Sequence, residues 1–319
     1  MALSVSMRSR LVKGAMLLFL CCLPVFPSVV LSGAKNGLLL WFNQVLPSLL
    51  PFLILSTLFL STGLSDSIAN RLAPVLSPVF RCSPAGCYAV IIGLFAGLPI
   101  GAKTVSALVD SGKITKKEGC YLLPLCNNPS PLFLLGFISV SVLERPDLCY
   151  VIFFIVTLSS VLAAMLLHRD FLRHAPDRSF CSDSVAPVKS RFTFSFLQLD
   201  AAIEQAFSVL TRVGGYIILF SVLAALLAVL PLPAPVLSCA GAFLEITSGS
   251  ASLAALSLPS SVFIPLVTGF VTFGGLSAAA QTKSVLAGTA LPFAHYLFTK
   301  AIAGLLAGLL MSVYVQLFG

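Results

Sequence analysis

The strongest constraint on this sequence is a series of apolar runs, each roughly 20 residues or longer, that recurs along the chain. They fall at about 11–32, 38–62, 86–109, 120–143, 148–168, 205–230, 236–258, 262–285 and 290–317. Such a run is long enough to cross a hydrocarbon layer about 30 Å thick. Only 9% of the 319 residues are charged, whereas a soluble domain usually carries about 25%. The sequence therefore predicts an all-α polytopic membrane protein.

The loop charges predict that one of these runs does not cross. Lys and Arg collect in cytoplasmic loops, and by this rule both the N-terminus and the stretch 63–85 are cytoplasmic. A full crossing by 86–109 would then place Lys113, Lys116 and Lys117 outside. We expect this segment instead to enter, break at "AGLPIG" and turn back. Backbone of that kind is tolerated only where protein or a water-filled cavity surrounds it. Whether 236–258 crosses or re-enters stays open.

A basic, Pro- and Ser-rich stretch at 169–198 has the composition of a linker. It divides the chain into a first membrane repeat at 36–168 and a second at 199–319, preceded by an N-terminal membrane helix at 1–35. The N-terminal run also resembles a signal peptide. However, it continues through Pro24 and Pro27 to Leu31, which is longer than the apolar part of such a peptide. A retained helix is therefore predicted.

The two halves share motifs in the same order, although apolar segments also resemble one another by chance. "VLPSLLPFLILSTL" from Val45 can be laid on "VLTRVGGYIILFSVL" from Val209, and "GLPIGAKTVSAL" from Gly97 on "GLSAAAQTKSVL" from Gly275. With an insertion of ten residues, Asn127 falls on His295. The loop charges give the halves opposite orientations. Together these features predict an inverted-repeat transporter-like bundle with re-entrant hairpins and broken helices, where interrupted segments mark the substrate site.

Polar groups beside the interruptions form the predicted substrate site. Lys103 supplies a positive charge, Asn127 and Asn128 supply amides, and Glu245 supplies a carboxylate. The alternatives are a Pro kink whose amides bond neighbouring helices, and mutual neutralisation of Arg212 and Glu245. Glu204 and Lys300 are expected near the interfaces, with their charged ends reaching water. The full predicted set is Gly97, Gly101, Lys103, Thr104, Asn127, Asn128, Glu245, Thr247, Ser248, Gly274, Gly275, Gln281, Thr282 and His295.

The charges within the spans favour an anionic solute. Four are cations (Lys103, Arg212, Lys283 and Lys300) and two are anions (Glu204 and Glu245) when histidine is neutral. The ends of broken helices add to this preference, since helix N-termini attract anions. The overall net charge of +8 comes largely from cytoplasmic loops, so it says less about the solute.

Enzyme, metal and nucleic-acid functions lack sequence support. There is no HExxH, GxSxG, P-loop or pair of intramembrane Asp residues, and the nine cysteines form no CxxC motif. His168, His174 and His295 are not spaced as a ligand cluster. We therefore expect no catalysis, no cofactor, no metal, no disulfide framework and no nucleic-acid partner.

Several motifs together carry a family resemblance. "LPSLLPFLILSTL", "GLPIGAK", "SGKITKKEG", "LCNNPSPLFLLGFI", "GAFLEITSGS" and "GGLSAAAQT" span about 36–317. This combination resembles the YlbJ-type sporulation integral membrane proteins of endospore-forming bacteria, within a wider group described as nucleoside recognition or Gate domain proteins. That group is similar to concentrative nucleoside carriers, which pair re-entrant hairpins with broken helices.

The resemblance implies a multi-pass protein needed in spore formation, in the outer forespore membrane. It implies transport of dipicolinic acid, a small aromatic dicarboxylate, towards the forespore. We therefore expect a carrier of a small organic anion. One alternative is a nucleoside or nucleobase carrier. Another is a non-transporting sporulation membrane scaffold that recruits a complex through 169–198. The expected partners are the anion, membrane lipid, and a second copy or other sporulation membrane proteins.

Overall fold

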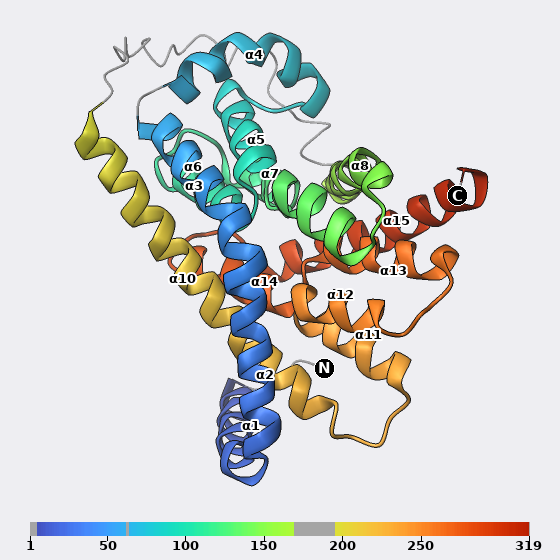
Figure 1. Ribbon diagram of the computed structural model, residues 1–319. Helices are drawn as coiled ribbons and strands as arrows, with labels where there is room; N and C mark the ends of the chain where they lie inside the picture. Colours follow the sequence, from blue (N-terminus) through green and yellow to red (C-terminus); the bar gives the residue numbers. More distant parts are fainter. Residues whose placement is uncertain (1–4, 62–63, 169–194, 319) are drawn as a thin grey trace.

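A computed structural model describes residues 5–61, 64–168 and 195–318, which form helices and contain no strand. The first half contains α1 (Val5–Val25), α2 (Pro27–Leu40), the π-helical turns η1 (Trp41–Val45), α3 (Leu46–Ser61), α4 (Leu64–Phe80), α5 (Pro84–Ala96), α6 (Ile100–Asp110), α7 (Lys116–Cys126), the π-helical η2 (Phe133–Val142), the 3-10 turn η3 (Pro146–Leu148) and α8 (Cys149–Leu167). The second half contains α10 (Phe196–Leu227), α11 (Ala234–Leu244), α12 (Ile246–Ala254), α13 (Ser260–Phe273), α14 (Gly275–Val285) and α15 (Phe293–Phe318) (Figure 1). The predicted all-α class is confirmed.

Among the described residues, four helical segments are long and apolar enough to cross a membrane: Pro146–Leu167, Phe196–Leu227, Ser260–Val285 and Phe293–Phe318. The number rises to six if each of two bent helix pairs counts as one span. The four segments match the runs predicted at 148–168, 205–230, 262–285 and 290–317. The protein is thus a polytopic helical membrane protein, as the sequence predicts.

The N-terminal helices differ from the prediction. The predicted run 11–32 is not one straight helix, because α1 ends at Val25 and the chain bends by 104° between the two helices. Pro27 is the first residue of α2, and proline suits that position because its missing N–H would have no partner there. Helix then continues without a gap to Ser61. The domain boundary predicted after residue 35 therefore falls inside α2.

Backbone contact joins α2 to α10, which run beside each other in Figure 1. A Cβ on Gly33 would lie 2.8 Å from Ala225 Cβ, and one on Gly37 would lie 2.9 Å from Ser221 Cβ. Further along, Trp41 Nε1 donates a hydrogen bond of 2.9 Å to the Leu210 carbonyl oxygen. Small residues permit this close approach between membrane helices. The pair forms one fixed side of the molecule.

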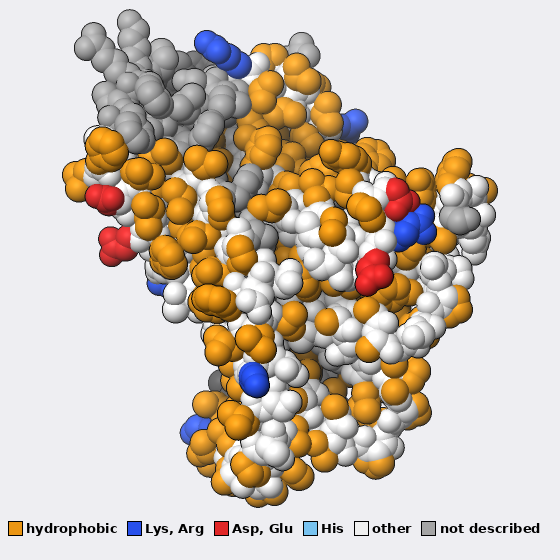
Figure 2. Space-filling view, viewed as in Figure 1, with side chains coloured by type: hydrophobic (Ala, Val, Ile, Leu, Met, Phe, Trp, Pro, Cys, Tyr) orange, Lys and Arg blue, Asp and Glu red, His pale blue; other side chains and the backbone are white. Residues whose placement is uncertain are grey.

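The C-terminal helix α15 packs on α13 in the same way. A Cβ on Gly304 would lie 2.8 Å from the Gly269 carbonyl oxygen. The outer face of α15 carries exposed apolar residues four apart in sequence: Leu305, Leu309, Val313 and Leu317. Residues with that spacing share one helix face. Figure 2 shows apolar side chains over most of the visible surface and few charged ones, as expected of a surface that meets lipid.

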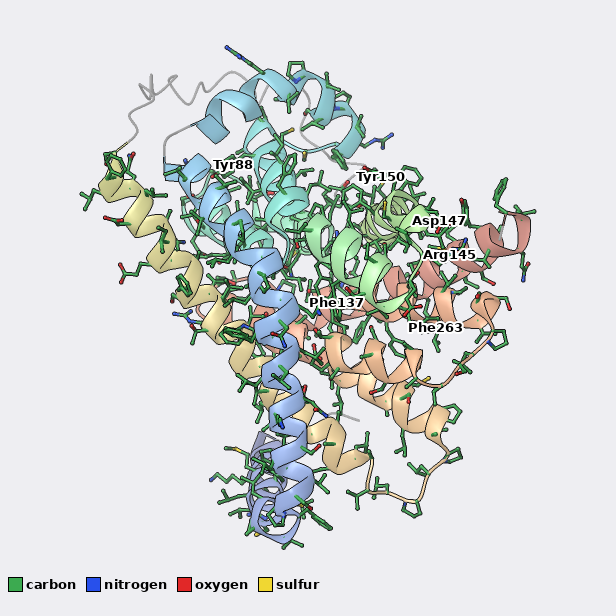
Figure 3. The ribbon with its side chains drawn as sticks, viewed as in Figure 1. Tyr88, Phe137, Arg145, Asp147, Tyr150 and Phe263 are labelled. Atoms are coloured by element: carbon green, nitrogen blue, oxygen red, sulfur yellow. The ribbon has the colours of Figure 1, made fainter. Side chains whose placement is uncertain are left out.

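A short polar turn joins η2 to α8. Figure 3 labels Arg145 and Asp147 in this turn, where Arg145 Nη2 lies 2.8 Å from Asp147 Oδ2. Both side chains are exposed, so the ion pair adds little stability. Residues 144–147, "ERPD", lie in this turn. By contrast, most of the predicted linker 169–198 lies outside the described residues, and α10 already begins at Phe196.

The order of elements repeats between the halves, but in a different register from the sequence comparison. Each half contains a pair of short helices, then an interrupted helix, then a long helix: α5–α6, α7–η2 and α8, followed later by α11–α12, α13–α14 and α15. By this order the break at Gly97 corresponds to Glu245, not to Gly275. The proposed match of Gly97 to Gly275 is therefore wrong. Both glycines lie at breaks, but Gly97 joins a pair of short helices, whereas Gly275 lies in an interrupted long helix.

Candidate functional site

Helices α5 and α6 form hairpin 1, whose tip is Gly97–Pro99. Gly93 and Gly101 lie four residues either side of Gly97, and a Cβ on Gly101 would be 3.3 Å from Gly93 Cα. In one continuous helix these positions would be roughly 12 Å apart. The chain therefore reverses at the tip, as predicted for 86–109. Gly97 ends α5 with φ 67°, a backbone conformation that glycine adopts without strain.

Helices α11 and α12 form hairpin 2, whose tip is Glu245. A Cβ on Gly249 would overlap the backbone of Ala242, and Ser238 Oγ lies 3.5 Å from the Ser252 carbonyl oxygen. Both pairs are symmetric about Glu245, so the two helices lie side by side in opposite directions. The structure thus answers the question that the sequence left open: 236–258 turns back.

Each hairpin tip packs against a break in a longer helix. After α7, residues 127–130 leave the helix, and the Asn128 carbonyl oxygen accepts a 2.8 Å hydrogen bond from the Leu98 amide in the tip of hairpin 1. Between α13 and α14, Gly274 and Gly275 have φ values of 93° and 74°. A Cβ on Gly275 would lie 3.3 Å from the Leu244 carbonyl oxygen beside the tip of hairpin 2.

A partly open cavity of about 60 Å³ lies where the tips and breaks meet. Both hairpin tips and both breaks contribute to its wall, and α3, η1 and α10 complete it. Its lining residues are Val45, Leu49, Leu98, Pro129, Ser130, Phe133, Val213, Ile217, Glu245, Ile246, Thr247, Gly274, Ser277, Ala278 and Gln281. Apolar walls with a few convergent polar groups are typical of small-molecule sites.

Glu245 is the cavity's carboxylate and is almost fully buried. Its oxygens accept hydrogen bonds from the amides of Thr247 (3.0 Å) and Ser248 (2.6 Å), so it caps α12. The negative charge offsets the partial positive charge of that helix N-terminus. In contrast, α14 begins at Gly274, and its N-terminus has no side-chain cap at the cavity wall.

Asn127 and Asn128 connect the first break to the second half of the chain. Asn127 Nδ2 donates to Thr282 Oγ1 and to Tyr296 Oη, each at 2.8 Å. Asn128 Oδ1 accepts from Lys300 Nζ and from Ser160 Oγ, each at 2.7 Å. These amides therefore bond to neighbouring helices, as the alternative reading of a Pro kink expects. Asn127 Oδ1, however, is buried without a hydrogen-bond partner.

Lys103 and Thr104 lie away from this cavity, in a separate groove. The groove has a volume of about 450 Å³, lies between α3, α6 and α10, and also contains Lys113, Ser111 and Gln205. Ile100, at the start of α6, lines its other end. The groove therefore places two lysines along α6, ending next to the tip of hairpin 1.

His295 also lies outside the cavity lining. Its Nε2 is 2.9 Å from His168 Nε2, and His168 Nδ1 lies 3.0 Å from the Ala164 carbonyl oxygen. Burial lowers the pKa of His168, which follows the last residue of α8, below its usual 6.5. The pair therefore joins the end of α8 to the first turns of α15 with one shared proton.

Of the fourteen predicted site residues, four line the cavity and six lie in the tips, breaks and polar contacts near it. Glu245, Thr247, Gly274 and Gln281 line it. Six others belong to the tips, breaks and polar contacts around it: Gly97, Asn127, Asn128, Ser248, Gly275 and Thr282. Gly101 packs against Cys126, and Lys103, Thr104 and His295 lie elsewhere. Binding of a solute by each of these residues stays a prediction.

Sequence reasoning missed Lys300 and Tyr296. Lys300 was expected near an interface, but it is fully buried, so that expectation is wrong. The proposed pairing of Arg212 with Glu245 is also wrong, since Arg212 is exposed and Glu245 caps α12. One signal could have identified Lys300: it lies four residues after Tyr296, and residues four apart share a helix face.

Sporulation integral membrane protein YlbJ of Bacillus subtilis (strain 168) is 28% identical to this chain over 331 aligned residues, which cover 91% of the chain and 78% of that protein. The chain is thus similar to a YlbJ-type sporulation membrane protein over most of its length. No family model and no solved structure matches the chain. The grouping with Gate domain proteins therefore stays a prediction.

Proposed function

We propose that the protein carries a small organic anion across a membrane during sporulation, with dipicolinate as the candidate solute. One observation carries the proposal: both hairpin tips and both helix breaks meet at a single cavity. Interrupted segments in matching places of two repeats form the substrate sites of secondary transporters. A scaffold has no need of such a cavity.

The cavity and the groove, rather than the number of charges in the spans, favour an anionic solute. Of the four cations counted in the spans, Lys103, Arg212 and Lys283 are exposed and only Lys300 is buried. The uncapped N-terminus of α14 favours a carboxylate at the cavity. Lys103 and Lys113 would attract an anion into the groove along α6.

The size of the cavity indicates that the solute enters only after a change of shape. A cavity of about 60 Å³ has room for only a few water molecules. An aromatic dicarboxylate needs more space. We infer that one hairpin withdraws from its break to admit the solute, and that the other withdraws to release it.

Uptake of labelled dipicolinate by the purified protein in liposomes tests the proposal. We expect time-dependent uptake that saturates and is inhibited by unlabelled dipicolinate. Uridine serves as competitor for the nucleoside alternative. Inhibition by uridine with none by dipicolinate would favour a nucleoside carrier.

A chain without residues 169–194 tests the scaffold alternative in sporulating cells. A carrier should retain most of its activity, because the cavity is built from other residues. A scaffold that acts through this stretch should lose its function. Loss of sporulation together with unchanged uptake in liposomes would show that transport alone does not account for the role of the protein.

A further inference from the structure

Lys300 is fully buried and is connected to the tip of hairpin 1 through a single residue, Asn128. Its Nζ donates to Asn128 Oδ1 at 2.7 Å, and Ser160 Oγ donates to the same oxygen at 2.7 Å. The carbonyl oxygen of Asn128 accepts from the Leu98 amide at 2.8 Å. The protonation state of the Lys300 amine therefore acts, through Asn128, on the contact between hairpin 1 and the break after α7.

No carboxylate faces this amine in the described part of the chain. There, the one ion pair is Arg145–Asp147. An ammonium group has three N–H donors, and Asn128 Oδ1 is the acceptor that the contacts show. A buried charge with one neutral acceptor is costly to maintain. Ionisable residues inside membrane-spanning segments mark ion pathways and proton relays in membrane proteins.

The helices around Lys300 supply few other titratable groups. α7, α8 and α13 pack against α15, and α13 carries none. On or next to the remaining elements they are Lys116, Lys117, Glu118, Cys120, Tyr121, Cys126, Cys149, Tyr150 and His168, with His295, Tyr296 and Tyr314 on α15 and Lys283 on α14. None of these side chains forms a hydrogen bond to Lys300 among the described contacts. His295, at 2.9 Å from His168, belongs to its own pair.

We propose that Lys300 is the proton-carrying group that couples solute movement to a proton gradient. The inference rests on the proposed carrier function and adds the coupling ion. The lone pair of Nζ takes a proton from water on one side, and the ammonium holds Asn128 and the closed tip. Loss of that proton to water on the other side weakens this contact and releases hairpin 1.

The same geometry argues against a sodium ion at this place. Asn128 Oδ1 and Ser160 Oγ are oxygens of the kind that coordinate hard cations. Here Lys300 Nζ already occupies the position facing Asn128 Oδ1. The tethered amine takes the place of a free cation, so transport should not require sodium.

The experiment compares two assays of labelled dipicolinate in proteoliposomes. Accumulation is driven by an imposed pH gradient. Exchange is measured with equal dipicolinate and equal pH on both sides. For the unmodified protein, a gradient of about one pH unit should support up to about tenfold accumulation per coupled proton. A protonophore should abolish accumulation, and replacing sodium by choline should leave it unchanged.

Lys300→Gln removes the titratable amine but keeps a hydrogen-bond donor for Asn128. We expect it to lose accumulation and to keep exchange within about threefold, which corresponds to less than 1 kcal/mol. Lys300→Arg keeps a permanent charge and should likewise fail to accumulate dipicolinate. Lys283→Gln, which removes an exposed lysine on α14, is the control and should behave as the unmodified protein.

The outcomes distinguish failure of proton coupling by Lys300 from failure of the carrier function. If Lys300→Gln accumulates dipicolinate as well as the control, or if the protonophore has no effect on the unmodified protein, Lys300 is not the coupling group. Exchange by the unmodified protein without accumulation overturns the coupling but keeps the carrier. Absence of both activities in the unmodified protein overturns the carrier function and this inference with it. Because the protonophore test needs no variant, misfolding of Lys300→Gln leaves the proposal falsifiable.

Discussion

At the scale of the residue, Asn128 is the position on which most contacts depend. Its side-chain oxygen accepts from Lys300 and Ser160, its amide donates to the Leu125 carbonyl oxygen at 2.8 Å, and its backbone holds the tip of hairpin 1. These partners come from α15, α8, α7 and hairpin 1. A single side chain thus joins both halves of the molecule.

Asn128→Ala should destabilise the protein. It leaves the buried amine of Lys300 without its acceptor, and loss of a hydrogen bond to a charged group costs about 1.5–3 kcal/mol. Thermal unfolding in detergent measures the effect. Asn43→Ala is the matched control, since Asn43 is exposed. Equal stability of the two variants would show that the Asn128 contacts contribute little.

Lys103→Gln should weaken solute affinity without lowering stability. Lys103 is exposed in the groove along α6, and exposed charges contribute at most about 1 kcal/mol. We therefore expect KM for uptake to rise by about twofold to fivefold. The effect should shrink as salt increases. Lys283→Gln is the control, and an equal rise in KM for that variant would exclude a specific role for the groove.

At the scale of the element, the two hairpins and the two breaks build the proposed solute site. The hairpins depend on glycines where backbones touch, at Gly93 and Gly101 in one and at Gly249 in the other. Short helices of this kind gain most of their stability from tertiary packing. Changes at these glycines should therefore affect a whole hairpin.

Gly101→Ala should displace hairpin 1 from α7. The added Cβ would overlap the carbonyl oxygen of Cys126, and neither is the flexible end of a side chain. Such overpacking costs typically about 1–3 kcal/mol, and uptake should fall with it. Gly136→Ala is the control, because no atom lies within 4 Å of a Cβ built there. Thermal unfolding and uptake are compared. Full uptake by Gly101→Ala would contradict the tight packing of the hairpin.

The contact between α8 and α15 should weaken in acid. Burial lowers the pKa of His168 in the folded protein below the usual 6.5, so the unfolded chain binds the proton more readily. Stability is then complete above about 6.5 and decreases as the pH falls towards the folded value. Thermal unfolding between about pH 7.5 and 5.5 tests this. His168→Asn should show a smaller dependence on pH, and an unchanged slope would exclude His168 as the cause.

The sequence predicts where the hairpins and breaks lie better than it predicts how they pack together. Gly-Leu-Pro and Asn-Asn-Pro signal breaks through local backbone preferences, so hairpin 1 and the first break could be found. Glu245 was identified as a candidate, but not as the tip of a second hairpin, because "AFLEITSG" contains no proline. Lys300 was missed because hydropathy measures average polarity and cannot show which way one side chain points. The placement of Lys103 in a separate groove depends on tertiary packing that no local pattern contains.

At the scale of the whole molecule, the small cavity and the close packing of α2 on α10 imply different mobility. The cavity is small for the proposed solute, so we expect opening to separate hairpin tips from breaks. In contrast, α2 lies against the backbone of α10 at Gly33 and Gly37. We expect the hairpins to move while the pair α2–α10 stays in place.

Ser277→Cys should report this opening. Ser277 lines the cavity and is buried, so a thiol there should react slowly with a membrane-impermeant reagent. Dipicolinate should change the rate, by shielding the thiol or by shifting the balance between open and closed forms. The background is the parent chain with serine in place of Cys21, Cys22, Cys120, Cys149, Cys181 and Cys239. Of those that the structure describes, Cys21 is exposed and the other four are partly exposed. A rate that is fast and unaffected by dipicolinate would show that the cavity is not the solute site.

The seam at Gly33 and Gly37 has a consequence for how such a protein can diverge. Where a glycine lies against the Cβ and backbone atoms of another helix, a larger residue cannot be accommodated by a change of rotamer, so an exchange would require a matching exchange opposite. Side chains that line the chamber have more freedom to change one at a time. Under the proposed function, we therefore expect descendants of this chain to change their solute sooner than the packing of α2 on α10.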